Sequence, residues 1–317
     1  MKFVMFVTGL ALSLNAFAWT PKKPVDVVIG FAPGSGNEVS FRIVSSQVEK
    51  DNPGVRFVIN TKPGSDGVIA LNEFIKQPND GYHINVPSHT GIWVTSDFFY
   101  PQIKKFSLDD FEYVISIAKS PLAIIVNEKS TINSPEDFIK YLKSGGDKFV
   151  AAGSGAHKLA ADYTADYLNL PDNKLTTITY KGPSQAGLGV AAGDVETGII
   201  PLAIAASLAK SGKIKIIGIC GEFPIKGFEQ TPLMNKHIKG LNVYAGWGLI
   251  LPKNTPKEVV DWYVVNFVKA INSEEVKVKL EQNFMFTDSR EHTPEGFKNS
   301  MMQLRKQWVP ILEKITK

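Results

Sequence analysis

Short apolar runs alternate with helical spacing along most of this chain. The runs expected to form strands are Val25–Phe31, Phe57–Asn60, His83–Pro87, Leu122–Asn127, Phe149–Gly153, Thr176–Tyr180, Thr197–Ile200, Ile214–Ile219 and Gly246–Leu251. Turn residues and then apolar residues at helical intervals follow most of them. This alternation predicts an α/β fold built from units with parallel strands.

Several helices have clear start signals. Ser134-Pro135-Glu136-Asp137 combines a capping residue, a proline at the first helical position and acids in the first turn, and Thr293-Pro294-Glu295 repeats that pattern. Thr255-Pro256-Lys257-Glu258 has the spacing of a capping box. The segments after Thr255 and Thr293 are amphipathic, so we expect each helix to pack against a domain.

The chain is long enough for two domains. It has 317 residues, of which 44% are hydrophobic, and no low-complexity linker divides it. Without a linker, we expect the chain to cross between two lobes more than once, near Lys119–Leu122 and Gly221–Phe228. Residues 19–120 together with 224–317 are assigned to lobe 1, and residues 121–223 to lobe 2.

The N-terminus has the pattern of a secretory signal peptide. Met1-Lys2 is basic, Phe3–Leu14 is mostly apolar but too short to span a membrane, and Ala16-Phe17-Ala18 fits a cleavage site before Trp19. The alternative is a buried N-terminal helix or strand. We predict that residues 1–18 are removed, and that a soluble secreted protein remains.

Composition argues against two other classes of protein. The 35 basic and 31 acidic residues are scattered, with no basic run, so nothing supports nucleic-acid binding. The single cysteine, Cys220, has no partner for an internal disulfide and lies in an apolar run. We expect it to be a buried core residue without a redox role.

Glycine-rich turns connect predicted strands to predicted helices. The first is Pro33-Gly34-Ser35-Gly36-Asn37, and the second is Lys62-Pro63-Gly64-Ser65-Asp66-Gly67. The backbone N–H groups at a helix start favour an anion, and glycine allows close approach of a ligand. Asp66 complicates this interpretation, because its carboxylate repels an anionic ligand unless it points away or meets a cation.

Two more turns of this type occur in the second half of the predicted sheet. They are Gly153-Ser154-Gly155-Ala156-His157 and Tyr180-Lys181-Gly182-Pro183. In open α/β sheets, ligands bind outside the carboxyl ends of the strands. Loops from both lobes are therefore expected to form one cleft, which captures a small anion. Alone, each loop is equally well explained as an ordinary turn, and Lys181 as a solvated lysine.

Catalytic motifs are not evident. The histidines His83, His89, His157, His237 and His292 lack metal-ligand spacing, and there is no Gly-x-Ser-x-Gly motif. Val39 stands where a dinucleotide fingerprint needs its third glycine. We therefore predict no catalytic residues, no cofactor and no metal. The alternative, a secreted α/β hydrolase or transferase, requires a nucleophile–base pair such as Ser154 with His157 or Ser88 with His89.

Taken in order, these segments resemble the solute-binding proteins of tripartite tricarboxylate transporters, also called the Bug family. The resemblance runs from about Pro24 to the C-terminus and rests on Val28–Glu38, Asn60–Gly67, Gln77–Tyr82, Gly153-Ser154, Tyr180-Lys181-Gly182, Gly193–Ile200, Ser211–Lys215 and Gly246–Glu258. It implies a two-lobed periplasmic binding protein of type II-like topology, with the ligand cleft between the lobes. A small organic carboxylate would be held there and passed to a membrane permease.

The resemblance also implies a set of ligand contacts. By position these are Gly34, Ser35, Gly36, Gly64, Ser65, Asp66, Ser88, His89, Thr90, Ser154, Ala156, Tyr180 and Lys181, to which we add Asn37 and His157 as possible hydrogen-bonding loop residues. The chain departs from the family pattern at three places. Ser35, Asn37 and Glu38 replace a more glycine-rich loop, Asp66 replaces a glycine, and no acid follows Ile199-Ile200-Pro201.

The sequence leaves the ligand open among dicarboxylates, tricarboxylates, aromatic carboxylates and amino acids. A receptor lobe that serves a two-component sensor is a further alternative to the transport function. The resemblance implies that the protein is a monomer.

Overall fold

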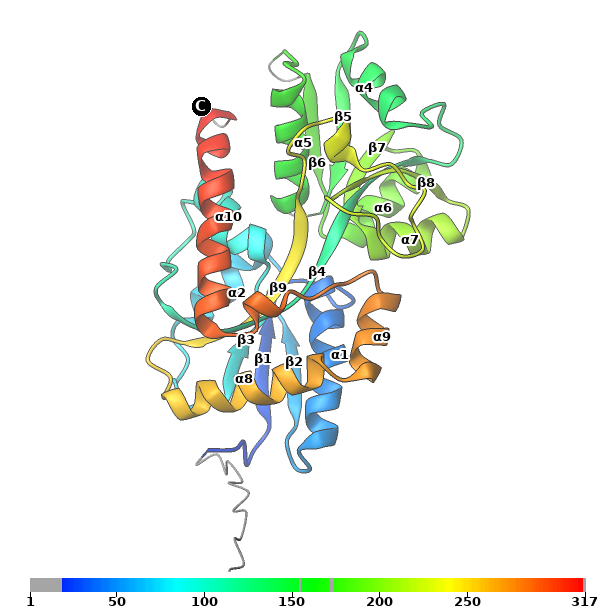
Figure 1. The fold of residues 1–317 in the computed structure, drawn as a ribbon. Coiled ribbons are helices and arrows are strands. Elements are labelled where there is room, and N and C mark those ends of the chain that lie inside the picture. Colours follow the sequence, from blue (N-terminus) through cyan, green and yellow to red (C-terminus); the bar gives the residue numbers. More distant parts are fainter. Residues whose placement is uncertain (1–18, 154, 172–173, 316–317) are drawn as a thin grey trace, which may run out of the picture.

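The computed structural model describes residues 19–153, 155–171 and 174–315. The predicted signal peptide, residues 1–18, and Ser154 lie outside the described residues. Within them, two groups of strands and helices lie at opposite ends of an elongated molecule, and a pair of long strands joins the groups (Figure 1).

Lobe 1 is built on parallel strands near the N-terminus. β1 (Val25–Ile29) pairs in parallel with β2 (Phe57–Thr61) and with β3 (His83–Asn85). The helices of this lobe are α1 (Gly36–Asp51), α2 (Val68–Phe74), α8 (Lys257–Ile271) and α9 (Glu274–Gln282). The predicted β–turn–α units are confirmed here, because each of these strands ends in a turn that leads into a helix.

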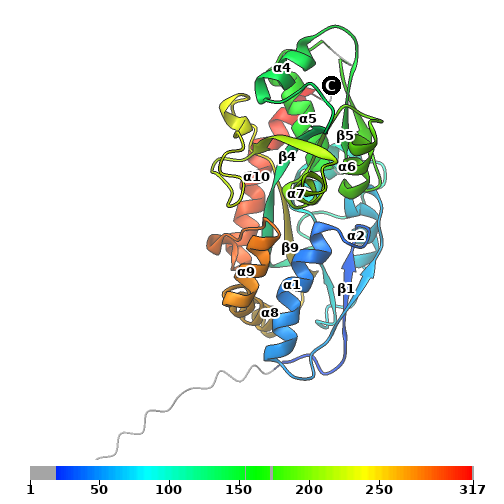
Figure 2. The ribbon, with the colours of Figure 1, turned by 90° about the vertical axis from the view of Figure 1, so that its right-hand side faces the viewer.

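Lobe 2 repeats this construction in the middle of the chain. β5 (Lys148–Ala152) pairs in parallel with β6 (Leu175–Thr179) and β7 (Thr197–Pro201), and β8 (Ile214–Cys220) follows. Its helices are α4 (Pro135–Lys143), α5 (Gly155–Tyr167), α6 (Pro183–Ala192) and α7 (Leu202–Lys210). Figure 2 shows the start of α1 directly below α7, so helices of the two lobes face each other there.

Two long strands cross between the lobes. β4 (Phe111–Asn127) and β9 (Tyr244–Pro252) pair antiparallel, from Phe111 opposite Pro252 to Pro121 opposite Tyr244. The strand predicted at Leu122–Asn127 therefore starts at Phe111. The expected parallel pairing holds only among β1, β2 and β3 and among β5, β6 and β7, because β4 pairs antiparallel with β7 and β8, and β9 pairs antiparallel with β3. Because β4 continues from the sheet of lobe 1 into the sheet of lobe 2, it cannot run parallel to the strands of both sheets.

The last helix, α10 (Pro294–Ile315), lies alongside both lobes (Figure 1). The Arg305 guanidinium donates to the Trp93 carbonyl of lobe 1 at 2.6 Å. Farther along α10, the Trp308 ring stands edge-on to Tyr163 of α5, with ring centroids 5.3 Å apart. The helix thus ties the lobes together on the side away from α7.

Short helical turns complete the described chain. They are η1 (Ser65–Gly67), the π-helical η2 (Gly91–Thr95), α3 (Ser96–Phe99), η3 (Met234–Lys236) and η4 (Ser289–Glu291). Leu233, just before η3, forms a β-bridge with Ile219 of lobe 2. The segment after β8 therefore packs against lobe 2 before the chain returns through β9.

Two of the three helix-start predictions are confirmed. Ser134 accepts the Asp137 N–H at 3.1 Å, and Thr293 accepts the Gly296 N–H at 3.0 Å. The capping box at Thr255 is wrong. α8 begins after Pro256, and the Thr255 hydroxyl donates to the Pro252 carbonyl at 2.7 Å instead. The hydroxyl bonds backward into the preceding turn, so it does not reach the helix start.

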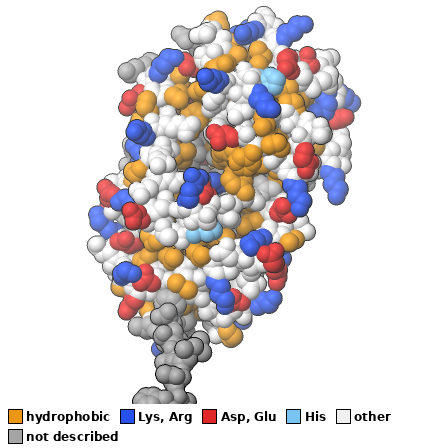
Figure 3. Space-filling model, in the orientation of Figure 1, with side chains coloured by type: hydrophobic (Ala, Val, Ile, Leu, Met, Phe, Trp, Pro, Cys, Tyr) orange, Lys and Arg blue, Asp and Glu red, His pale blue; other side chains and the backbone are white. Residues whose placement is uncertain are grey.

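The interior is largely apolar, and most charged side chains lie outside it, with Glu38, Asp66, Lys148 and Glu291 as buried exceptions. Cys220 is fully buried and free, which confirms its predicted core role, and burial raises the pKa of its thiol to about 12. On the face seen in Figure 3, positive and negative side chains are interspersed, and hydrophobic side chains gather near the middle. In the described part of the chain, no helix has both the length and the apolar character needed to cross a membrane.

Candidate functional site

The first glycine-rich loop connects β1 to α1 and faces lobe 2. Gly34 has a φ of +79°, which glycine adopts at little cost, and its N–H donates to a Glu38 carboxylate oxygen at 2.7 Å. The Asn37 amide donates to the Val86 carbonyl at 2.8 Å. Asn37, which we considered a ligand contact, therefore anchors α1 to the end of β3.

Ser35 is the residue that precedes α1. Its side chain makes no capping bond, it is 8% exposed, and its hydroxyl is buried without a hydrogen-bond partner. Buried hydroxyls in proteins are usually paired. The Ser35 hydroxyl is thus a hydrogen-bond donor at the start of α1 that has no acceptor among the described residues.

The second loop brings a carboxylate to lobe 2. Ser65 and Asp66 have φ values of +48° and +55°, and the Asp66 carboxylate accepts the Gly155 N–H at the start of α5 at 2.6 Å. The Tyr100 hydroxyl donates to the same oxygen at 3.4 Å. Burial outweighs both hydrogen bonds and raises the pKa of Asp66 to about 6. Asp66 therefore points into the interface between the lobes.

Ser88, His89 and Thr90 follow β3 and are buried. The Ser88 hydroxyl accepts the Gly91 N–H at 3.4 Å, and the Thr90 hydroxyl donates to the Tyr244 carbonyl at 3.3 Å. Burial lowers the pKa of His89 to about 3. These side chains fix the turn against β9.

In the third loop, His157 makes a hydrogen bond within the loop itself. His157 Nδ1 accepts the Gly153 N–H at 3.0 Å, and burial lowers the pKa of His157 to about 3. Ala156 is buried beside it at the start of α5. A histidine with so low a pKa is a weak general base at neutral pH. The Ser88 contact to Gly91 likewise gives no support to a Ser88–His89 pair, and Ser154 lies outside the described residues.

The fourth loop does not project its side chains into the cleft. The Tyr180 ring packs against Gly189 of α6, where an added Cβ would overlap the tyrosine hydroxyl. Lys181 is exposed to solvent. Neither residue lines the interlobe pocket, although the loop itself leads into α6, which does.

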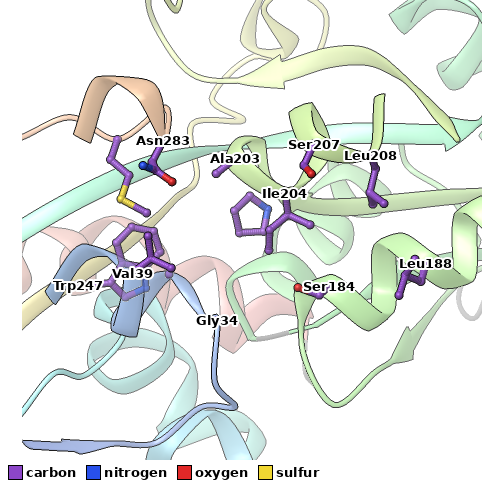
Figure 4. Close-up of a pocket in the computed structure, with 13 residues that line it drawn as sticks. Gly34, Val39, Ser184, Leu188, Ala203, Ile204, Ser207, Leu208, Trp247 and Asn283 are labelled. Atoms are coloured by element: carbon purple, nitrogen blue, oxygen red, sulfur yellow. The ribbon is translucent and has the colours of Figure 1, made fainter. Parts of the chain in front are cut away.

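A pocket of about 320 Å³ lies between the lobes (Figure 4). Val39 and Trp247 form one side, and side chains of α6 and α7 form the other. The lining residues are Gly34, Gly36, Val39, Ser184, Leu188, Pro201, Ala203, Ile204, Ser207, Leu208, Trp247, Asn283 and Met285. Most of this surface is apolar, with hydroxyl and amide groups at a few points, as in typical small-molecule sites.

Among the predicted contacts that the structure describes, Gly34 and Gly36 line this pocket, and the others do not. The contribution of α7 to the pocket was not predicted from the sequence. Pro201 follows the predicted strand Thr197–Ile200 directly, and a position at the carboxyl end of a strand could have indicated a ligand contact. Ser184 follows the fourth loop directly. Trp247 gave no signal, since it lies inside the apolar run of β9.

Gly64 and Ser65 lie in the turn that positions Asp66, apart from the pocket lining. Over the described ranges, no group of three or more histidine, cysteine, aspartate or glutamate side chains is arranged to hold a metal ion.

Known proteins match this chain over most of its length. The family described as "Tripartite tricarboxylate transporter family receptor" matches residues 41–314. The chain is 27% identical over 277 residues to a UPF0065 protein from the tcbD–tcbE intergenic region of Pseudomonas sp. strain P51, which covers 86% of this chain and 80% of that protein.

Solved structures share the fold. A protein of R. palustris with adipate has a TM-score of 0.86 at 21% identity, covering 93% of this chain and 98% of that one. MatC from Rhodopseudomonas palustris with bound malate has a TM-score of 0.83 at 18% identity, covering 92% and 100%. At these identities the similarity shows the fold alone, and it confirms the predicted two-lobed binding-protein architecture.

Proposed function

The chain belongs to the tripartite tricarboxylate transporter receptor family, and we propose that it is a periplasmic binding protein that captures a small organic carboxylate between its lobes. It would deliver that ligand to a membrane permease. The two related structures that carry adipate and malate support the ligand class.

The observation that carries this proposal is the interlobe pocket at the start of α1. Gly34 and Gly36 line it. Glu38 accepts the Gly34 N–H, whereas the first N–H groups of α1, from Gly36 onward, have no intrahelical acceptors. Together with the helix dipole, these donors attract an anion. The unpartnered Ser35 hydroxyl at the same helix start supplies one more donor.

The pocket draws on both lobes, which suggests how binding is signalled. Val39 and Trp247 come from the lobe 1 side, and Ser184 and Ile204 come from α6 and α7 of lobe 2. A ligand that contacts both walls stabilises the closed arrangement over an open one. We propose that the chain enters lobe 2 near residue 120 and returns to lobe 1 through β9, later than the predicted boundary at residue 223, because Leu233 still pairs with Ile219 of lobe 2. We also propose that the permease recognises the closed form.

The first experiment is a thermal-unfolding screen of residues 19–317 against mono-, di- and tricarboxylates, aromatic carboxylates and amino acids. A ligand at one hundred times its dissociation constant stabilises the folded state by about 2.7 kcal/mol. We expect such a shift for one class of carboxylate. Absence of any shift, together with absence of a co-purified acid in mass spectrometry of the denatured protein, would refute the proposal.

A matched pair of variants tests the location of the site. Ala203 of α7 lines the pocket, so Ala203→Phe should fill it and weaken binding at least tenfold. Ala206→Phe places the same ring on the same helix at a half-buried position outside the pocket lining, and should preserve binding. Equal loss of binding in both variants would count against this pocket.

A further inference from the structure

Two carboxylates of the chain itself already occupy backbone donors near the interlobe pocket. Glu38 accepts the Gly34 N–H at 2.7 Å, and Arg42 pairs with Glu38 at 2.7 Å and balances its charge. Asp66 accepts the Gly155 N–H at 2.6 Å. Within the described residues, the hydrogen bonds that act on the Asp66 carboxyl come from Gly155 and the Tyr100 hydroxyl, and neither donor is a cation.

Asp66 takes the position that an anionic ligand would occupy at α5. A helix start binds one anionic oxygen per available N–H, and here the Gly155 N–H is already engaged. Asp66 is only 8% exposed, so water screens its charge poorly. A second carboxylate that approached the start of α5 would meet a like charge and find the donor occupied.

Asp66 also lies near the segment that pairs with Trp247, which lines the pocket. A Cβ placed on Gly91 would be 3.5 Å from the Asp66 Cβ and 3.2 Å from the Ser88 hydroxyl. Ser88 in turn forms a β-bridge with Trp247, which lines the pocket. Gly91 therefore lies between the Asp66 side chain and the Ser88 segment that pairs with Trp247.

The pocket itself offers little to a second negative charge. None of its 13 lining residues is charged, and most of its side chains are apolar (Figure 4). Its anion-binding end is the start of α1 at Gly36, beside the unpartnered Ser35 hydroxyl, because Glu38 already accepts the Gly34 N–H. Opposite lie Leu188, Ile204 and Leu208, which suit a hydrocarbon body. Removing a carboxylate from water into such surroundings without a partner is costly.

We propose that Asp66 is a specificity-determining residue that restricts the ligand to monocarboxylates with an apolar body. This inference rests on the proposed function, since it assigns the ligand class of the same cleft. One ligand carboxylate binds at the start of α1, and its hydrocarbon body lies against Trp247 and α7. At the start of α5, the Asp66 carboxylate occupies the place that the second carboxylate of a dicarboxylate ligand would take.

The test compares acids that differ only in a second carboxylate. Dissociation constants are measured by calorimetry at pH 7.5 for linear four- to eight-carbon monocarboxylates and their matching dicarboxylates, including hexanoate with adipate, and for benzoate with terephthalate. The proteins are the wild type, Asp66→Asn and Asp162→Asn. The asparagine at position 66 keeps an oxygen that can accept the Gly155 N–H. Asp162, which accepts from Lys158, is a control acid elsewhere on α5.

We expect the wild type to bind its best monocarboxylate at least tenfold more tightly than the matching dicarboxylate. Asp66→Asn should tighten dicarboxylate binding at least tenfold and leave monocarboxylate binding within threefold, and Asp162→Asn should leave the ratio unchanged. Tighter binding of dicarboxylates by the wild type, or an unchanged ratio in Asp66→Asn, overturns the inference and leaves the proposed function standing. If folded wild-type protein binds no acid of either kind, the proposed function and the inference both fail.

Discussion

Replacing Asp66 with asparagine should stabilise the protein more at neutral pH than at acidic pH. Asp66 is buried, and burial outweighs its hydrogen bonds from Gly155 and Tyr100, which raises the pKa of its carboxyl from 3.8 to about 6. The folded protein therefore binds a proton at this site more tightly than the unfolded chain does. Protonated Asp66 favours folding, and ionisation removes that contribution.

The size of the effect follows from the two pKa values. The contribution is fully present only well below pH 3.8, where Asp66 is protonated in both states, and it is lost as the pH rises through about 6. A shift of this size, at 1.36 kcal/mol per unit, corresponds to about 3 kcal/mol. Asparagine does not ionise. The free energy of unfolding of Asp66→Asn, relative to wild type, should therefore increase by most of that amount, about 2 kcal/mol, between pH 4 and pH 7, because the unfolded carboxyl is already more than half ionised at pH 4.

Urea unfolding followed by tryptophan fluorescence measures this difference directly. Wild type and Asp66→Asn are compared at several pH values between 4 and 7.5, and Asp194→Asn, which removes an exposed carboxylate of lobe 2, serves as the control. The other titrating groups are common to both proteins and cancel in the difference. A stability difference that changes by less than about 1 kcal/mol across this range would refute the assigned burial of Asp66.

Three further changes test particular contacts. Gly36→Ala adds a Cβ that overlaps the Trp247 ring, so thermal unfolding should show a loss of about 1–3 kcal/mol, and an unchanged midpoint would mean that the ring does not cover the start of α1. Trp308→Ala removes a side chain that is 1% exposed, and the cavity should cost about 3–5 kcal/mol of stability in urea unfolding. A loss below about 1 kcal/mol would show that Trp308 is not packed between α10 and the lobes. Ser134→Ala removes the acceptor of the Asp137 N–H and should cost about 1 kcal/mol by the same assay; no loss would show that water replaces the cap.

Local sequence signals predicted the parts of this protein that depend on neighbouring residues. The strand–turn–helix units, the helix starts at Ser134 and Thr293 and the burial of Cys220 all follow from periodicity, capping chemistry and apolar runs. The capping box at Thr255 shows the limit of this reasoning. Its spacing was right, but the hydroxyl found a nearer acceptor in the preceding turn.

Contacts between distant segments could not be predicted in this way. The pairing of β4 with β9 joins residues more than a hundred positions apart, and apolar periodicity does not state which strands pair or in which direction. For the same reason, no local pattern predicted that Trp247 would line a pocket or that Tyr180 would turn toward α6.

Asp66 shows most clearly which properties of this site follow from the sequence and which depend on the tertiary structure. The sequence alone placed an acid in a glycine-rich turn before a helix, and it raised the question of what that acid would meet. Only the packing of lobe 1 against lobe 2 brought the carboxylate to the Gly155 N–H and away from water. Turns and helix starts are set by interactions over a few residues, whereas the burial and the partners of a side chain depend on which surfaces the folded chain brings together.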